Sequence, residues 1–263
     1  MRAKETVVIL LIAVTLVAGA IATGCGSSSS MPGPNNPPGQ SSSPTPSPSP
    51  SPSPTGSPGT VHANEGGVLG TPGMFTAPSD HGGAPVDGIT CDPTMSDNYH
   101  IHIWIGVYVN GVSTNFNPTY ALPIAIGMQD PGPPGPPGAF ITTAKCFYHI
   151  HTHDSSGIVH VEDPDPSKTP ITGTLYTLKQ VFDIWGVTVN GTQVDKFVGP
   201  VRVYTSGQVY RGNQNGGVVP ASTLTQWTGD PNAIPLYSHE VIMLEVGPTY
   251  PAQLPNVAFY TEF

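Results

Sequence analysis

Histidine clustering is the strongest chemical signal in this chain of 263 residues. Seven of the nine histidines fall in three segments with strand-like patterns, 99–110, 146–162 and 239–247. Imidazoles two residues apart on a strand share a face, with Cβ atoms about 7 Å apart, so two rings can converge on one ion. A ring from a neighbouring strand can then complete a three-nitrogen site. The spacing therefore predicts a metal centre built on a sheet.

The candidate ligands follow from this spacing. We expect the metal to be held by His100, His102, His151, His153 and His160. Additional or supporting ligands are His149, His239, Glu162 and Asp154. The alternative is a polar sheet face whose imidazoles bind only one another and water. His62 and His81 lie in glycine-rich flanking sequence, and we expect them to be solvated.

A donor set rich in imidazole and poor in thiolate narrows the choice of metal. Such a set suits zinc, copper, nickel or non-haem iron, whereas calcium and magnesium prefer oxygen ligands. The affinity order of the divalent transition metals and an oxidising compartment favour copper, whereas the high frequency of zinc sites in proteins favours zinc. We therefore expect copper or zinc.

Residues 146–162 predict a hairpin around a Ser-Ser-Gly turn. If residues 153 and 158 pair, His151 lies opposite His160 and His149 lies opposite Glu162. Alternation then places all four of these side chains on one face, together with His153.

The segment 99–110 alternates over twelve residues, with isoleucines and valines on one face and His100, His102 and Trp104 on the other. This pattern predicts a long, half-buried strand. Asn110-Gly111 predicts a type I′ turn, followed by a return strand that includes residues 123–128.

Three further segments complete the predicted fold. Residues 177–185 carry apolar side chains at helical spacing, with Thr177 as a possible cap and Gly186 as a stop. Residues 201–210 predict a hairpin around Ser206-Gly207, and 239–247 a closing strand. The expected class is α+β and β-rich, a mostly antiparallel sheet of hairpins with one short helix.

Composition excludes two classes of protein. Charged residues are only 10% of the chain, with 8 Lys and Arg against 17 Asp and Glu, so there is no basic face for nucleic acid. The only apolar run of membrane-spanning length is at the extreme N-terminus, which excludes a polytopic membrane protein.

The N-terminus has the layout of a bacterial secretory signal. Positive residues precede the apolar segment 7–22, and Ala22-Thr23-Gly24-Cys25 resembles a lipobox, although its first position is usually Leu. We expect a lipoprotein signal peptide over 1–24, lipidation of Cys25, and a protein of the cell envelope that faces the periplasm or the exterior. An uncleaved anchor helix is the alternative.

The mature chain divides by composition. Residues 25–60 form a disordered tether rich in serine and proline, too poor in apolar side chains to fold. A glycine-rich lead-in spans 61–87, and one globular domain rich in histidine spans 88–263. Cys91 and Cys146 remain as an even pair in an oxidising compartment, and we expect a disulfide between them. The alternative for Cys146 is a thiolate metal ligand.

The block Cys146-Phe-Tyr-His-Ile-His-Thr-His-Asp-Ser-Ser-Gly-Ile-Val-His-Val-Glu162 carries a resemblance. With the upstream His100 and His102 and the downstream 178–185, it resembles a family of uncharacterised secreted or lipid-anchored bacterial and archaeal proteins. The resemblance covers roughly residues 88 to 247. It implies an extracytoplasmic domain centred on these histidines and leaves the mechanism open.

Three functions are compatible with these patterns. The first is a non-enzymatic metal-binding lipoprotein. The second is a metal-dependent enzyme, a hydrolase or oxidase, in which three imidazoles leave an open position and Glu162 or Asp154 is the general base. The third is a structural or adhesion domain without metal, which the long tether favours.

Replacing Cys25 by Ser should leave the protein without lipid, because the lipid is attached through the cysteine sulfur, which serine lacks. Mass spectrometry of protein purified from membranes measures the modification. Acyl chains on the Cys25→Ser variant, or processing at the same bond, would contradict the lipoprotein assignment.

Overall fold

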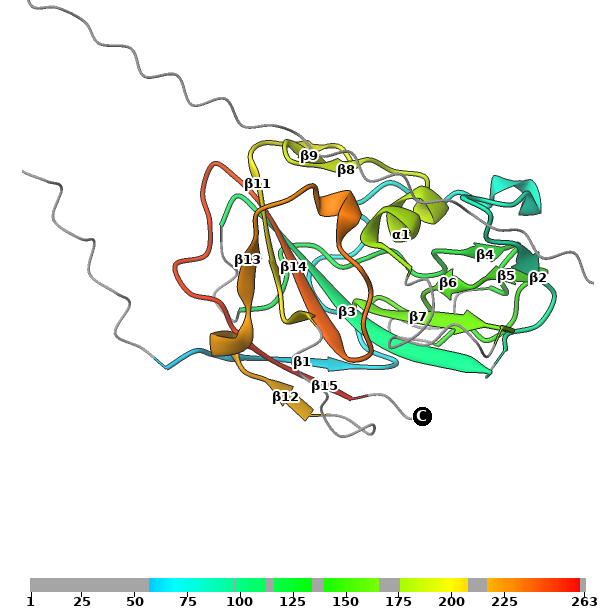
Figure 1. Ribbon diagram of the computed structural model, residues 1–263, viewed down its shortest axis with the longest axis horizontal. Coiled ribbons are helices and arrows are strands. Elements are labelled where there is room, and N and C mark those ends of the chain that lie inside the picture. Colours follow the sequence, from blue (N-terminus) through cyan, green and yellow to red (C-terminus); the bar gives the residue numbers. More distant parts are fainter. Residues whose placement is uncertain are drawn as a thin grey trace, which may run out of the picture. The chain divides into compact units, whose positions relative to one another are not determined.

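The longest strand, β3 (Tyr99–Val109), lies inside a six-stranded sheet (Figure 1). The computed structural model describes residues 57–96, 98–111, 116–133, 140–165, 176–207 and 217–260, all within one compact unit. The predicted signal peptide, the lipobox and most of the tether lie outside the described residues. Among the described residues, no helix has the length and apolar character needed to cross a membrane.

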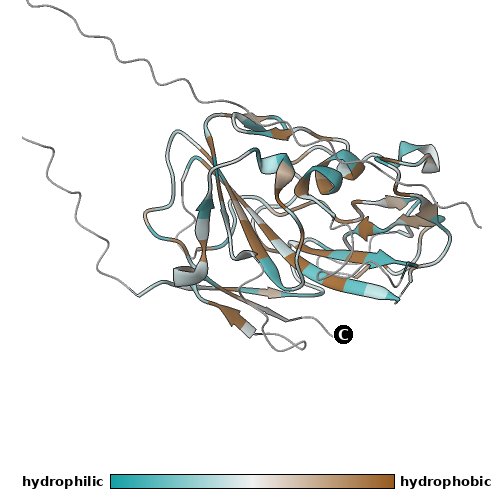
Figure 2. Cartoon of the chain, in the orientation of Figure 1, coloured by the Kyte–Doolittle hydropathy of each residue, from teal (hydrophilic) through white to brown (hydrophobic). Residues whose placement is uncertain are grey.

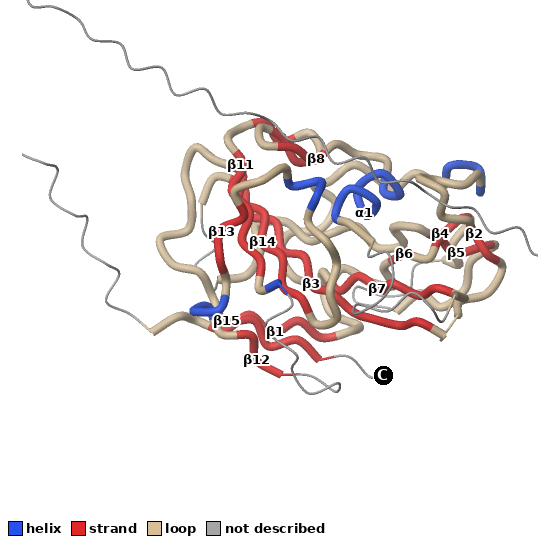
Figure 3. The backbone as a smooth tube through the Cα atoms, in the orientation of Figure 1, coloured by secondary structure: helices blue, strands red, loops and turns tan. Residues whose placement is uncertain are grey.

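Strands outnumber helices in the described part of the chain, and loops and turns of very different length connect them (Figure 3). Besides β3, the strands are β1 (Thr60–Asn64), β2 (Cys91–Asp92), β4 (Met128–Gln129), β5 (Cys146–Tyr148), β6 (Ile150–His151), β7 (Ile158–Asp163), β8 (Val189–Asn190), β9 (Gln193–Val194), β10 (Phe197–Val198), β11 (Val201–Thr205), β12 (Gly217–Val219), β13 (Thr225–Trp227), β14 (Glu240–Val246) and β15 (Asn256–Tyr260). The helices are α1 (Leu178–Trp185) and three single 3₁₀ turns, η1 (His81–Gly83), η3 (Ala221–Thr223) and η4 (Pro231–Ala233).

The large sheet has the order β13-β11-β14-β3-β7-β6. Only the central pair β14 and β3 is parallel, and the other neighbours are antiparallel. The β-rich α+β class is therefore confirmed. A sheet of simple hairpins is too local a description, because β3 pairs with two strands that are distant in the chain.

The turn after β3 also differs in part from the prediction. Asn110 and Gly111 both have positive φ, 54° and 103°, as a type I′ turn requires. The predicted return strand at 123–128 is wrong, since most of these residues form a turn that leads into β4. Among the described residues after this turn, Thr119 and Tyr120 pair with Val107 of β3.

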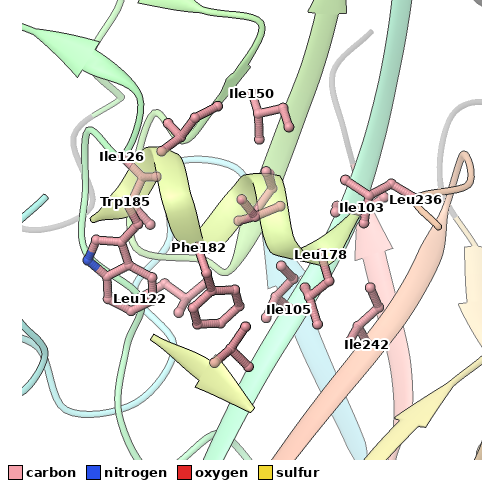
Figure 4. Packing of buried hydrophobic residues seen from close by; sticks show 14 of the residues in the cluster. Ile103, Ile105, Leu122, Ile126, Ile150, Leu178, Phe182, Trp185, Leu236 and Ile242 are labelled. Carbon is pink, nitrogen blue, oxygen red and sulfur yellow. The ribbon is translucent and has the colours of Figure 1, made fainter. Parts of the chain in front are cut away.

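One face of the large sheet packs against α1. The isoleucines of β3 contact the buried face of α1, which carries Leu178, Phe182 and Trp185 (Figure 4). The helix has the predicted ends: Thr177 forms a capping box with Gln180, and Gly186 takes the left-handed conformation that stops the helix. The helix prediction for 177–185 is thus confirmed.

The opposite face of β3 is also buried, so the prediction of a half-buried strand is wrong. A second sheet, β1-β15-β12, covers this face, and its cluster includes Trp104 and Tyr108 of β3. The covering strand β1 comes from the stretch expected as a lead-in, and it pairs in parallel with β15 near the C-terminus. Figure 2 shows that hydrophilic residues gather where β3 begins and β7 ends, next to this buried apolar region.

The predicted disulfide between Cys91 and Cys146 is present. It joins β2 to β5 in the small sheet β2-β5-β4, with the two Cα atoms 5.4 Å apart. The bond closes a loop with a sequence separation of 55, which the chain-entropy model values at about 4 kcal/mol. Because its sulfur is in the disulfide, Cys146 is not a thiolate ligand.

Glu245, a buried carboxyl of β14, makes the stability of the fold dependent on pH. It pairs across the strands with Tyr108 on one side and Arg202 on the other. Burial raises the pKa of Glu245 from 4.5 to about 7, although the charge of Arg202 acts in the opposite direction.

Replacing Glu245 by Gln should remove this dependence. Between pH 4.5 and 7 the Glu245 carboxyl binds more protons in the folded protein than in the unfolded chain, so its contribution to stability is greatest below pH 4.5 and is lost as pH rises through 7. The free energy of unfolding of Glu245→Gln, relative to that of wild type, should therefore rise by about 2 to 3 kcal/mol between pH 4.5 and 8. Urea unfolding at several pH values measures the difference, and parallel profiles for the two proteins would contradict this explanation.

Candidate metal centre

Strand pairing brings three histidines into one row across the large sheet. His102 of β3 lies directly opposite His160 of β7, and His160 lies directly opposite His151 of β6. The register predicted for His151 and His160 is therefore confirmed. Neighbouring strands are about 4.8 Å apart, so the rings must contact one another. The ring centroid of His160 is 4.4 Å from that of His102 and 5.6 Å from that of His151.

Two more imidazoles flank this row. His100 precedes His102 by two residues, and its Nε2 lies 3.3 Å from Nδ1 of His160. His153 follows His151 by two residues, and the two Nε2 atoms are 3.2 Å apart. His100 is half-buried, and the other four rings are buried. All five imidazoles predicted as ligands therefore lie together.

Two carboxylates enter the same cluster. Glu162 Oε1 lies 3.3 Å from His100 Nε2, 3.6 Å from His160 Nδ1 and 3.7 Å from His151 Nε2. Glu65 Oε1 lies 3.2 Å from His160 Nε2 and 3.7 Å from His102 Nε2. Both side chains are only 5% exposed. Hereafter, the histidine cluster means His100, His102, His151, His153, His160, Glu65 and Glu162.

Within the described residues, two groups have ligand atoms close enough to hold an ion. One is His151, His153, His160 and Glu162, and the other is His100, His102 and His160. In each group the ligand atoms lie within 4.8 Å of one another. His160 belongs to both groups, as its central place in the row requires.

The backbone fixes the protonation of two rings. His151 Nδ1 is 3.0 Å from the carbonyl oxygen of Tyr148, and His153 Nδ1 contacts that of Ile141. A carbonyl only accepts, so each Nδ1 donates its hydrogen and each neutral ring keeps a lone pair on Nε2. These lone pairs face each other at 3.2 Å, an arrangement that a cation between them would stabilise. Metal-binding histidines commonly hold their second nitrogen in this way.

Three of the buried rings are kept neutral. Burial, with a contribution from neighbouring imidazoles, lowers the pKa of His102 to about 2 and that of His153 to about 4, and it lowers the pKa of His151 well below 6.5. Burial alone would also lower the pKa of His160, but hydrogen bonds to Glu162 and Glu65 outweigh it and raise this pKa. Neutral imidazole is the form that binds metal.

Two polar atoms of the cluster stand out. Among the described residues, His102 Nε2 and Glu162 Oε2 are buried and make no hydrogen bond. Leaving a buried polar atom without a hydrogen bond costs about 1 to 3 kcal/mol, and more for a charged group. Metal ligation would satisfy both atoms.

Glu65 is the site residue that sequence reasoning missed. It follows β1 in an Asn-Glu-Gly-Gly stretch that has the composition of a linker. A turn closed from Gly67 N to Asn64 O directs the chain past the cluster. A lone acidic residue between glycines has no periodic pattern, so only the docking of this segment identifies it.

Asp154 holds the segment that carries Glu65 in place and is not a ligand. Its carboxylate accepts hydrogen bonds from the backbone N–H groups of Ser156 and Gly66. Leu69 N also donates to Ser155 O at 3.0 Å. Asp154 therefore ties the segment that carries Glu65 to the turn between β6 and β7. Its predicted role as an extra ligand or a general base is corrected to a positioning role.

His149 lies on the other side of the sheet, contrary to the prediction. The segment 146–153 is not one strand, because β5 belongs to the small sheet and β6 to the large one, and the alternation fails at His149 between them. Its Nε2 lies 2.9 Å from Asp92 Oδ2, and its Nδ1 lies 3.1 Å from the hydroxyl of Tyr176. That hydroxyl donates to Asp163, which alternates with Glu162 along β7.

The remaining histidines lie outside the two ligand groups. His239 borders the cluster, since its backbone N–H donates to His102 O at 2.8 Å and its Nδ1 is 2.9 Å from Ser238 Oγ. His62 is exposed, as predicted. The expectation of a solvated ring is wrong for His81, which is half-buried. Its Nε2 donates to Ile184 O at 2.9 Å, so it supports the end of α1.

A cavity of about 720 Å³ opens beside the cluster. His100, His153, His160 and Glu162 form its polar wall. The other walls include Met95, Phe140 and Phe147, and the Phe140 ring stacks on His153 with 4.1 Å between centroids. The cluster is therefore buried on the sheet side and accessible to a small molecule from this cavity.

Comparisons with family models, curated proteins and solved structures found no match. The geometry of the cluster therefore carries the functional argument.

In the metal-free protein, His151 and His153 should both be Nδ1–H tautomers, because backbone carbonyls accept from these nitrogens. Long-range ¹H–¹⁵N correlation of the imidazoles distinguishes the two tautomers directly. An Nε2–H tautomer at both positions would contradict the facing lone pairs.

Proposed function

We propose that this chain is a lipid-anchored protein of the cell envelope that binds copper or zinc through the histidine cluster. The observation that carries the proposal is the pair of Nε2 atoms of His151 and His153, which face each other at 3.2 Å while backbone carbonyls hold both Nδ1–H groups. The predicted signal peptide and lipobox support the location, as does the disulfide.

The donor chemistry supports a transition metal. The cluster offers five imidazoles and two carboxylates, and the cysteines nearest to it are consumed by the disulfide. Nitrogen-rich sites of this kind suit copper(II) and zinc, whereas a site for calcium or magnesium would be rich in oxygen.

Charge supports the same conclusion. Glu65 and Glu162 are buried beside His160, whose raised pKa lets it balance at most one of their two negative charges. The other charge needs a compensating cation. A divalent ion supplies that charge. It also stabilises the fold by mass action, by about 2.7 kcal/mol at a concentration 100 times Kd.

A double variant, His151→Ala with His153→Ala, should lose metal binding, because it removes both facing lone pairs. Calorimetric titration of the full chain in detergent with Zn(II), and separately with Cu(II), should show affinity at least 100-fold weaker than that of wild type. His149→Ala is the matched control, since it removes an imidazole from the same segment but from the other face of the sheet.

Equal, weak binding in wild type and the double variant would mean that the histidines only line a polar sheet face. The structural or adhesion function would then replace the metal-binding one. Circular dichroism of each variant establishes that the fold is retained before the affinities are compared.

A metal-dependent enzyme is the second candidate, and the cavity is the observation that favours it. A metal bound beside the cavity would meet a molecule held against Phe140 and Phe147. Such a metal lowers the pKa of bound water to about 7, and Glu162 faces the same cavity as a candidate base. A hydrolase and oxidase screen of the metal-loaded and metal-free proteins separates this function from simple binding.

A further inference from the structure

We propose that the histidine cluster holds two metal ions, with the His160 imidazole bridging them through its two nitrogens. This inference rests on the proposed metal binding and deepens it. Five imidazoles and two carboxylates are seven ligand groups, whereas zinc in proteins takes four ligands, or five in some states. One ion therefore leaves part of the cluster unused.

The strand order separates the ligands into two halves. His160 lies on β7, between His102 on β3 and His151 on β6. The two outer strands are two spacings apart, roughly 10 Å. Consistent with this, the two ligand groups share His160 and no other residue.

Both ring nitrogens of His160 face ligand atoms. On one side, Nδ1 lies 3.3 Å from His100 Nε2 and 3.6 Å from Glu162 Oε1, and on the other, Nε2 lies 3.2 Å from Glu65 Oε1. In the described residues, neither nitrogen of His160 hydrogen-bonds to a backbone carbonyl, in contrast to the Nδ1 atoms of His151 and His153. The ring is thus oriented to bind a metal ion through each nitrogen, rather than to bind one ion and donate to a backbone carbonyl.

The distances between ligand atoms assign each ligand to one of the two ions. The first ion is held by His151 Nε2, His153 Nε2, Glu162 and Nδ1 of His160. The second is held by His102, Glu65 and Nε2 of His160. His100 can be grouped with His102 and His160, but its Nε2 lies 3.3 Å from both Glu162 Oε1 and His160 Nδ1, so its ring faces the ligands of the first ion.

Each half contains a buried polar atom without a hydrogen bond in the part of the chain that is described. Glu162 Oε2 is in the first half and His102 Nε2 is in the second. Their residues are 5% and 4% exposed. An ion in only one half would leave the buried polar atom of the other half without a partner, which costs free energy.

Charge and protons balance for two divalent ions. The carboxylates of Glu65 and Glu162 contribute two negative charges. A bridging imidazole has lost its single N–H proton and contributes a third, so two divalent ions leave a net charge of +1. The proton passes to water in the cavity that His160 lines.

Metal stoichiometry tests the inference on the full chain. Metal-free protein is loaded with Zn(II), and in a second series with Cu(II), and metal per chain is measured by elemental analysis after free metal is removed. We expect two ions per chain in wild type and in the control His149→Ala. Glu65→Gln keeps the size of the side chain but removes its charge, and we expect one ion per chain.

Electron paramagnetic resonance of the Cu(II) series provides a second readout. Spin coupling through the bridge should remove most of the signal of the wild type, whereas Glu65→Gln should show the full signal of one isolated copper per chain. One ion per chain in wild type overturns the two-ion centre and leaves the proposed function intact. No bound metal overturns both. Two uncoupled copper ions in wild type overturn the bridge.

Discussion

The pairing of β3, β7 and β6 is the constraint on which the site depends. Because directly opposed residues of neighbouring strands share a face, this register places His102, His160 and His151 in one row. A shift of one residue in either pairing would turn one of these imidazoles to the face that packs on α1. The apolar residues that alternate with the histidines, such as Ile101 and Val161, oppose such a shift because they fill the core below the helix.

A second constraint is the cover on the histidine face. The sheet β1-β15-β12 buries the far end of that face with Trp104, and the turn after β1 delivers Glu65 to the near end. Asp154 connects the two regions, since it binds Gly66 and also shapes the turn before β7. The same covering segment therefore supplies both a carboxylate and the exclusion of water, which strengthens electrostatic interactions inside the cluster.

The cluster is a costly arrangement for a protein that does not bind an ion. Neutral imidazoles, two carboxylates and two polar atoms without hydrogen bonds are buried beside an apolar core. Local structure maintains this arrangement through backbone carbonyls that orient His151 and His153 and through the disulfide that secures β5, which precedes them. The open side, at the cavity with Phe140, is where a small molecule could reach the histidine cluster.

Patterns with a short range could be predicted from the sequence. The alternation of 99–110, the helix at 177–185 with its caps, the disulfide and the opposition of His151 and His160 depend on local periodicity or on a short turn. Tertiary structure decided the rest. Glu65 reaches the site because β1 pairs with β15 at the other end of the chain, and His149 leaves it because β5 and β6 join different sheets. Pairing between distant strands leaves no periodic signal in either segment, so the sequence determined which residues could bind a metal, and the fold decided which of them meet.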